Sequence, residues 1–373
     1  MKRSLVLLFL LWIVPFGRAL AQESTALVSD AASNRPSAFQ LDGFRFEYQG
    51  WNNCGPATLT NALTFFGYTD NQQRAAHYLK PNGEDKNVTP REMVSFVNWQ
   101  VPELSVFALT RIGGDLDLLK TLLANRFPII IEEGYDPPPH DLGWMGHYLL
   151  LIGYDDAAQH FVTLDSYEGP NQYYGYDHIN EYWRHFNRRY IVLYDSGREP
   201  ELLELLGTNA DLVQNALNAL EKARDEATHD PEDPYVWFNL GSSYVALADI
   251  YAHSGYTSIS GDYEQQAYQY AVVAYDEARK LGLPWRMMWY QFGPLEAYNA
   301  VGRYDDTLKL TSANLSDGGG QWVEETFYYA GVAREGMGET ARALDNYKQA
   351  VFLNSNYAEA RAAMDRLQAP ASS

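Results

Sequence analysis

The segment around the single cysteine of the chain carries the residue types of nucleophilic catalysis. It reads Gln49-Gly50-Trp51-Asn52-Asn53-Cys54-Gly55-Pro56. Apolar residues at i, i+3, i+4 and i+7 follow in Gly55 to Phe66, so we expect Cys54 at the start of a helix, where backbone N–H groups and the helix dipole favour a thiolate. The alternative is a buried cysteine that serves only as a small hydrophobic residue.

A thiolate nucleophile needs a general base, and the base needs an orienting group. His147 begins the apolar run His-Tyr-Leu-Leu-Leu-Ile-Gly-Tyr, and Asp165 closes the run Phe161 to Leu164. A histidine at the end of a buried strand is rarely there for packing, although a satisfied core or surface histidine is the alternative. Asp165 could equally form a turn or cap a helix.

The spacing of these two runs predicts a hairpin that brings base and carboxylate together. The polar turn signal lies at Asp155 to Ala158. If the hairpin is centred on Asp156, His147 pairs directly with Asp165, and directly opposed Cβ atoms lie about 4.5–5.5 Å apart. We therefore expect an imidazole–carboxylate hydrogen bond, whereas a slip of one residue would turn Asp165 to the other face.

Three further features bear on the chemistry of the site. The side-chain amide of Gln49 could donate to the oxyanion of an acyl-transfer intermediate, although glutamine is more often a surface residue. The Pro-rich, aromatic loop from Glu133 to Gly146 precedes the base and is a candidate wall for the substrate. With one cysteine and no histidines at metal-ligand spacing, we expect neither a metal nor another cofactor.

The elements that must position these residues indicate an α+β domain, because helices come first and strands afterwards. Helices are expected over Gly55 to Phe66, from the Thr89 cap with Pro90 and Glu92 behind it, and over about Asp115 to Ala124. Four short apolar runs predict buried strands: Pro128–Ile131, His147–Tyr154, His160–Leu164 and Tyr190–Tyr194.

After Gly197-Arg198-Glu199-Pro200 the pattern becomes almost entirely helical and repeats itself. The spacings are those of tetratricopeptide repeats, whose small residues let two helices pack closely. These repeats stack into a solenoid with a concave binding surface, and a rigid spacer is the alternative. Three sets of residues carry the pattern: Phe327, Ala330, Gly331, Arg334, Ala343, Tyr347 and Ala350; Trp237, Leu240, Gly241 and Tyr244; and Ala271, Tyr275, Ala278 and Pro284 after an insertion of roughly 18 residues.

The N-terminus predicts export. Lys2 and Arg3 precede the apolar run Leu5 to Phe16, and Ala19-Leu20-Ala21 follows as a cleavage site, as in a secretory signal peptide. We therefore expect a secreted or periplasmic protein with no membrane span after signal cleavage. The predicted organisation is a signal peptide at 1–21, a linker at 22–40, the α+β domain at 41–197 and the repeat domain at 205–369.

Composition narrows the class of partner. The formal net charge of −20 argues against a nucleic acid or an anionic membrane, because phosphate binding needs a dense basic surface. With 373 residues, 46% of them hydrophobic, the chain is long enough for two packed cores. The expected partners are a peptide or protein substrate and a protein on the repeat surface.

The segments QGWNNCGPATLTNAL and GHYLLLIGYDDAAQHFVTLDSYEG, with the order Gln, Cys, His, Asp, resemble the bacteriocin-processing (double-glycine) type of papain-like cysteine peptidase. The resemblance covers roughly Phe44 to Tyr194. It implies an α+β papain-like fold in which Gln49 serves the oxyanion hole, Cys54 is the nucleophile, His147 is the general base and Asp165 orients the base.

The leading hypothesis is an exported cysteine peptidase that hydrolyses peptide bonds through a thioester acyl-enzyme, with a repeat domain that binds protein. One alternative keeps the acyl-enzyme and transfers it to an amine, as transglutaminase-like relatives do. The other is a catalytically silent scaffold that binds peptides. An intact Cys-His-Asp set argues against the scaffold, since a binding module has no reason to keep an unpaired exported thiol.

Overall fold

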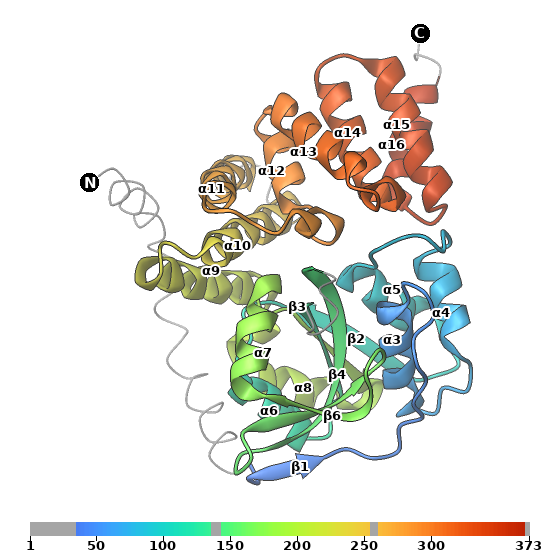
Figure 1. The fold of residues 1–373 in the computed structure, drawn as a ribbon, viewed down its shortest axis with the longest axis vertical. Helices are drawn as coiled ribbons and strands as arrows, with labels where there is room; N and C mark the ends of the chain where they lie inside the picture. Colours follow the sequence, from blue (N-terminus) through green and yellow to red (C-terminus); the bar gives the residue numbers. More distant parts are fainter. Residues whose placement is uncertain (1–34, 136–142, 254–259, 370–373) are drawn as a thin grey trace.

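The computed structural model describes residues 35–135, 143–253 and 260–369. An antiparallel sheet flanked by helices is followed by a C-terminal helical region (Figure 1). The predicted signal peptide at 1–21 and the linker up to residue 34 lie outside the described residues. Among the described helices, none is long and apolar enough to cross a membrane.

The described strand pairs are all antiparallel, and the strands run in the order β2-β7-β3-β4-β5-β6. Strand β1 pairs with the C-terminal end of β4. The central strand β4 of the sheet is almost wholly buried, because neighbouring strands and helices cover it. The strands are β1 (Ala38–Gln40), β2 (Val106–Arg111), β3 (Ile129–Tyr135), β4 (Met145–Asp155), β5 (His160–Asp165), β6 (Gly169–Gly175) and β7 (Tyr190–Asp195).

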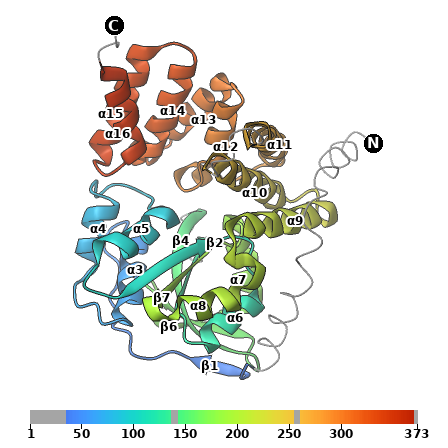
Figure 2. The same ribbon diagram turned by 180° about the vertical axis from the view of Figure 1, so that it is seen from behind.

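Helices cover both faces of this sheet (Figures 1 and 2). On one face lie α3 (Cys54–Thr64), α4 (Gln72–Leu79) and α5 (Pro90–Gln100), and on the other lie α6 (Leu116–Ala124), α7 (Tyr176–Trp183) and α8 (Glu199–Leu206). Strands β3 and β4 are longer than predicted, so the expected loop from Glu133 to Gly146 is partly strand. Residues 136–142 of that loop lie outside the described residues.

Local signals for helix ends are confirmed. Thr89 caps α5 with a complete capping box, since its hydroxyl accepts from the Glu92 amide and the Glu92 carboxylate accepts from the Thr89 amide at 2.7 Å. The Asp115 side chain caps α6 by accepting from the Leu118 amide at 2.8 Å. These contacts depend only on neighbours along the chain, which is why the sequence pattern found them.

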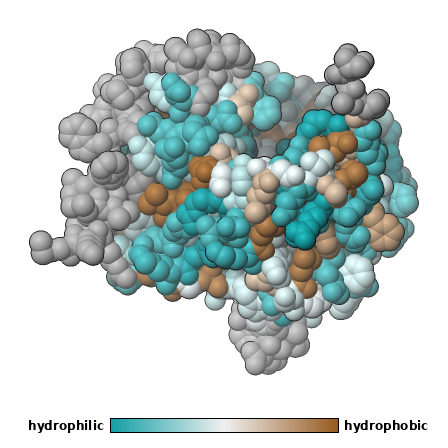
Figure 3. Space-filling model, turned by 90° about the horizontal axis from the view of Figure 1, so that it is seen from above, coloured by the Kyte–Doolittle hydropathy of each residue, from teal (hydrophilic) through white to brown (hydrophobic). Residues whose placement is uncertain are grey.

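The helical region repeats one packing contact. A Cβ added at Gly241 would lie 2.6 Å from Tyr275 Cε1, and one added at Gly331 would lie 2.6 Å from Tyr347 Cε1. The surface of this end is mostly hydrophilic, with hydrophobic residues in small patches (Figure 3). The helices are α9 (Leu212–His229), α10 (Pro234–His253), α11 (Ser260–Leu281), α12 (Gly293–Ala300), α13 (Tyr304–Ser316), α14 (Glu324–Gly336), α15 (Thr340–Leu353) and α16 (Ala358–Gln368).

The sheet and the helical region have separate cores. Leu202 and Leu206 of α8 belong to the core of the sheet domain, beyond residue 197, where we predict its end. The largest described core of the helical region is built by α9 to α12. Buried polar contacts join the two parts: Asn215 Nδ2 to the Ile112 carbonyl (2.8 Å), Asn187 Nδ2 to Ser243 Oγ (3.0 Å) and Lys222 Nζ to the Gly114 carbonyl (2.6 Å).

The β4–β5 hairpin has a different register from the predicted one. Asp155 pairs with His160 across a four-residue turn, and a bulge between Leu151 and Gly153 shifts the pairing again, so Asp165 lies opposite Leu149. The prediction that His147 is directly opposite Asp165 is therefore wrong. Because the displacement is two residues, and side chains alternate with period two, Asp165 still lies on the face that carries His147.

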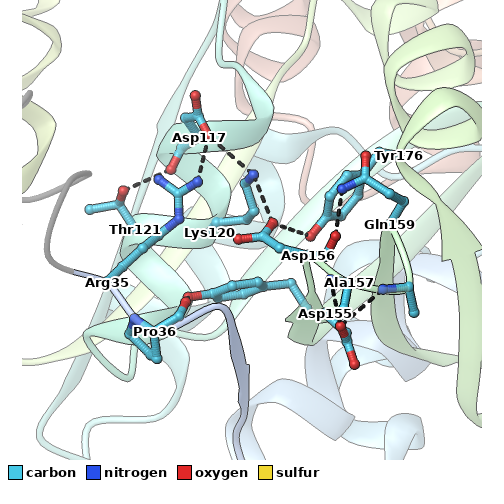
Figure 4. A network of polar contacts seen from close by, with 12 residues as sticks. Arg35, Pro36, Asp117, Lys120, Thr121, Asp155, Asp156, Ala157, Gln159 and Tyr176 are labelled. Atoms are coloured by element: carbon cyan, nitrogen blue, oxygen red, sulfur yellow. Dashed lines mark hydrogen bonds and ion pairs between the residues drawn. The ribbon is translucent and has the colours of Figure 1, made fainter.

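The position of this turn is set by tertiary contacts (Figure 4). Asp156 accepts from Lys120 Nζ of α6 at 3.1 Å and from the Tyr176 hydroxyl of α7 at 2.8 Å. Within the turn, the Asp155 carboxylate accepts from the Ala157 amide at 2.8 Å. Helices on the outer face therefore hold the centre of the turn between Ala157 and Ala158, one and a half residues beyond the predicted centre at Asp156.

Candidate active site

Cys54 is the first residue of α3 and is partly buried. The loop before it is held by one buried side chain of α4, Gln72. Gln72 Oε1 accepts from the Gly50 amide (2.7 Å) and from Asn53 Nδ2 (3.0 Å), while Gln72 Nε2 donates to the Tyr48 carbonyl (2.7 Å). The thiol is thereby placed at the exposed N–H groups of a helix start, which favour an anion.

A buried cation lies behind the same loop. Lys80 Nζ donates to the carbonyl oxygens of Asn52 (3.0 Å), Gly83 (3.2 Å) and Asp85 (3.3 Å), and the residue is 4% exposed. Burial lowers the pKa of Lys80, while the charges of Asp85 and Cys54 oppose that shift. The ammonium group therefore stabilises the loop and adds positive charge near the sulfur.

His147 lies near the start of β4, and its Nε2 is 2.8 Å from Asp165 Oδ1. Burial alone would lower the pKa of His147, but the Asp165 carboxylate and the Cys54 side chain, which hydrogen-bonds the ring, outweigh it and raise the pKa well above the usual range. Since Nε2 donates to Asp165, Nδ1 is the nitrogen left for proton exchange with the sulfur. The predicted imidazole–carboxylate hydrogen bond is present, although the two residues meet diagonally across the hairpin.

Asp165 is buried and surrounded by donors. Its Oδ1 also accepts from the amides of Tyr167 (2.8 Å) and Glu168 (3.2 Å), and its Oδ2 accepts from the Tyr174 hydroxyl (2.6 Å). Burial alone would raise the pKa of Asp165, but His147, Tyr174 and the Tyr167 amide lower it to about 2. The carboxylate is therefore ionised at neutral pH and can hold the ring in one orientation.

Gln49 is held by Ser166, a residue that the sequence analysis did not single out. The Ser166 hydroxyl donates to Gln49 Oε1 at 2.9 Å, and the backbone N–H of Gln49 donates to the Ser166 carbonyl at 2.8 Å. Because the side-chain oxygen is engaged in this way, the Nε2 group is the end that can donate to a ligand. Tyr174 and Ser166 carry no motif of their own, since only the folded hairpin brings them to Asp165 and Gln49.

A second buried carboxyl group flanks the base. Glu133 of β3 pairs directly with His147 of β4 and has no exposed surface. Burial raises the pKa of Glu133, and His178 Nε2 lies 3.6 Å from Glu133 Oε2. Glu133 is an acidic residue at the end of an apolar strand, which is a signal that the sequence carries, whereas the Pro-rich pattern after it predicts a loop from Glu133 onward.

One residue of the helical region reaches this site. A Cβ added at Gly146 would lie 2.8 Å from Tyr290 Cδ1, so the absence of a side chain there admits the ring. Burial raises the pKa of Tyr290, and the nearby Cys54 side chain adds to the shift. Within the described part of the chain, no cluster of His, Cys, Asp or Glu is arranged to hold a metal ion.

Residues 34–196 match the Peptidase_C39 like family. This indicates a cysteine-type peptidase, a hydrolase. The matched segment contains the nucleophile loop, both strands of the hairpin and Gln49, and ends before α8. None of the curated proteins matches the chain.

Two solved structures are similar to part of the chain. A protein described as a C39-like peptidase from Bacillus anthracis shares 15% identity over 42% of this chain and 97% of its own, with a TM-score of 0.35. Xylellain, a cysteine protease from Xylella fastidiosa, shares 15% identity over 44% of this chain and 88% of its own, also with a TM-score of 0.35. Similarity at this level carries no argument about activity.

Proposed function

We propose that the protein is an exported peptidase in which Cys54 is the nucleophile, His147 the general base and Asp165 the orienting group. The supporting observation is that the imidazole beside a helix-start cysteine is held at 2.8 Å by a buried carboxylate. A nucleophile, a base and an orienting group in contact are the combination that thiol catalysis needs.

The proposed mechanism uses the side chains as they lie. The Cys54 thiol gives its proton to His147 Nδ1 and the thiolate attacks the peptide carbonyl carbon, while Gln49 Nε2 and the backbone N–H of Cys54 donate to the oxyanion. His147 Nδ1 gives its proton to the leaving amine, which leaves a thioester on Cys54. Water then attacks the thioester carbonyl while His147 accepts its proton, and the carboxylic acid departs from the sulfur.

For the helical region we propose tetratricopeptide repeats that bind protein. The support is the recurring contact in which Gly241 faces Tyr275 and Gly331 faces Tyr347, because close approach at a small residue is how the two helices of such a repeat pack. Export through a signal peptide at 1–21 is part of the same proposal and rests on the sequence pattern alone.

The test is hydrolysis of a peptide library by purified protein, with products identified by mass spectrometry. We expect cleavage by the native protein, and a loss of kcat/KM of about 10⁴-fold or more in Cys54→Ala and in His147→Ala, because these side chains act as one unit. Circular dichroism of both variants serves as the folding control. Products extended by an added amine would favour acyl transfer, and a folded native protein that cleaves nothing would favour the scaffold.

A further inference from the structure

A cavity of about 800 Å³ lies between the sheet domain and the helical region. Its walls come from α5 and β3 on one side and from α10, α12 and α14 on the other. Glu132 and Tyr290 line it, and the pKa values of both are raised by burial and further by the nearby Cys54 side chain. Tyr290 packs against Gly146, the residue before His147, so the cavity approaches the candidate active site, and its volume is in the range of sites for small ligands.

Most cations that line this cavity are already engaged. Arg91 Nη2 forms an ion pair with Glu359 at 2.5 Å, and the Arg111 guanidinium donates to backbone carbonyls of residues 209 and 210 at 2.6–2.7 Å. Burial lowers the pKa of Arg189, and the nearby charge of Glu132 opposes that shift. Carboxyl groups are thus in excess, and four that line the cavity have no ion pair among the described residues: Glu92, Asp249, Glu296 and Glu325.

Among these four carboxyl groups, Glu325 is the one with a buried oxygen that lacks a hydrogen-bond partner among the described residues. It lies in the first turn of α14, is 7% exposed, and its Oε2 has no hydrogen-bond partner within the described part of the chain. Burial raises the pKa of Glu325 well above the usual range, and the charges of Glu92 and Asp85 add to the shift. A buried polar oxygen without a donor is unfavourable unless a ligand supplies one.

A second acidic position faces the same cavity from α10 and α12. The Tyr268 hydroxyl lies 2.7 Å from Glu296 Oε1 and 3.3 Å from Asp249 Oδ1, so it bridges the two carboxyl groups. The rings of Tyr275, Tyr290 and Tyr329 also line the cavity, and aromatic faces attract cations. Unpaired carboxyl groups and aromatic faces together favour an ammonium or guanidinium group.

We propose that this interdomain cavity binds a segment of the polypeptide substrate and selects a lysine or arginine side chain through Glu325 and the Asp249–Glu296 pair. This assignment rests on the proposed peptidase function and adds the substrate class. It makes the helical region part of the substrate site, since Asp249, Glu296 and Glu325 all belong to it.

The test measures binding without turnover, in full-length Cys54→Ala protein. The probes are hexapeptides of alternating Ala and Ser, labelled with fluorescein at the N-terminus and amidated at the C-terminus, with a single Lys or a single norleucine placed at each position in turn. We expect fluorescence anisotropy to give a Kd at least tenfold lower for Lys than for norleucine at one position or more. The ratio should fall below threefold in Glu325→Gln and should persist in Glu221→Gln, an exposed carboxylate on α9.

Equal affinity for Lys and norleucine at every position would overturn the assignment, and so would a preference that survives in folded Glu325→Gln. If Glu325→Gln does not fold, Glu296→Gln carries the same expectation and the same contrary outcome. Because binding is measured in a variant without the thiol, its result is independent of whether the native protein cleaves the library. Failure of the peptidase proposal and failure of this inference are therefore distinguishable.

Discussion

Two buried carboxyl groups of this molecule differ in their hydrogen-bond donors and in the direction of their pKa shifts. Asp165, within the sheet domain, accepts hydrogen bonds from His147, Tyr174 and two backbone amides, and its pKa is lowered to about 2 despite burial. Glu325, on α14 where the helical region meets the sheet domain, has one oxygen with no donor among residues 35–135, 143–253 and 260–369, and burial raises its pKa. The first group is satisfied by the fold itself, whereas the second needs a proton or a ligand, which is why we assign orientation to one and binding to the other.

If the groups around Asp165 are preorganised for catalysis, removing the oxyanion donor should have the largest effect among them. We expect Gln49→Ala to lower kcat by about 10²–10³-fold, with a small change in KM, because the amide acts on charge that develops in the transition state. The matched control is Ser166→Ala, which leaves the amide in place and removes only the bond that orients it. A loss confined to KM in Gln49→Ala would contradict an oxyanion role.

The Asp165 side of the comparison is tested by Asp165→Asn. We expect a smaller loss than in His147→Ala, about 10–100-fold in kcat/KM, since an asparagine oxygen can still accept from His147 while Tyr174 accepts from the new amide. The carboxylate helps to raise the pKa of His147, so the variant should lose its imidazolium at lower pH. The alkaline limb of the pH–rate profile should therefore move to lower pH, and a limb that stays in place would argue against charge coupling between the two side chains.

The buried carboxyl groups between the sheet domain and the helical region predict the opposite dependence of stability on pH. Burial raises the pKa of Asp85 to about 7, and the charge of Glu92 adds to this, while the Asn87 amide, which donates to Asp85 Oδ1 at 3.2 Å, and the charge of Lys80 oppose it. A carboxyl group with a raised pKa in the folded state binds more protons there than in the unfolded state, so stability should fall as pH rises from about 4 to 7. Asp165 adds almost no pH dependence above about pH 5, because its stabilising contribution is complete there and is lost only as pH falls through the unfolded pKa of about 3.9 toward about 2.

We therefore expect urea unfolding to give a higher free energy of unfolding at pH 5 than at pH 7.5, and Asp85→Asn to reduce that difference by about 2 kcal/mol. Asp305→Asn, an exposed position on α13, is the control and should leave the difference unchanged. A native protein that is equally stable at both pH values would show that the boundary carboxyl groups keep their ordinary ionisation.

Local patterns predicted local structure well. The Thr89 capping box, the helix that begins at Cys54 and the strand from His147 were all expected, because caps and periodicity depend on residues close in sequence. Strands β1, β2 and β6 and helices α4 and α7 were not expected. Strand β6, for example, reads Gly-Pro-Asn-Gln-Tyr-Tyr-Gly, and its pairing with β5 gives it an extended form that its composition does not favour.

By itself the sequence determined which residue types carry the proposed chemistry and that His147 and Asp165 lie on neighbouring strands. Only the tertiary structure decided the register, since Lys120 and Tyr176 hold the turn at Asp156 and a bulge follows. It also decided which partners tune the site: Ser166 reaches Gln49 and Tyr290 reaches Gly146 across 117 and 144 residues of chain, respectively. Such contacts leave no pattern in the sequence, because periodicity records which face of an element is buried and not which distant side chain covers it.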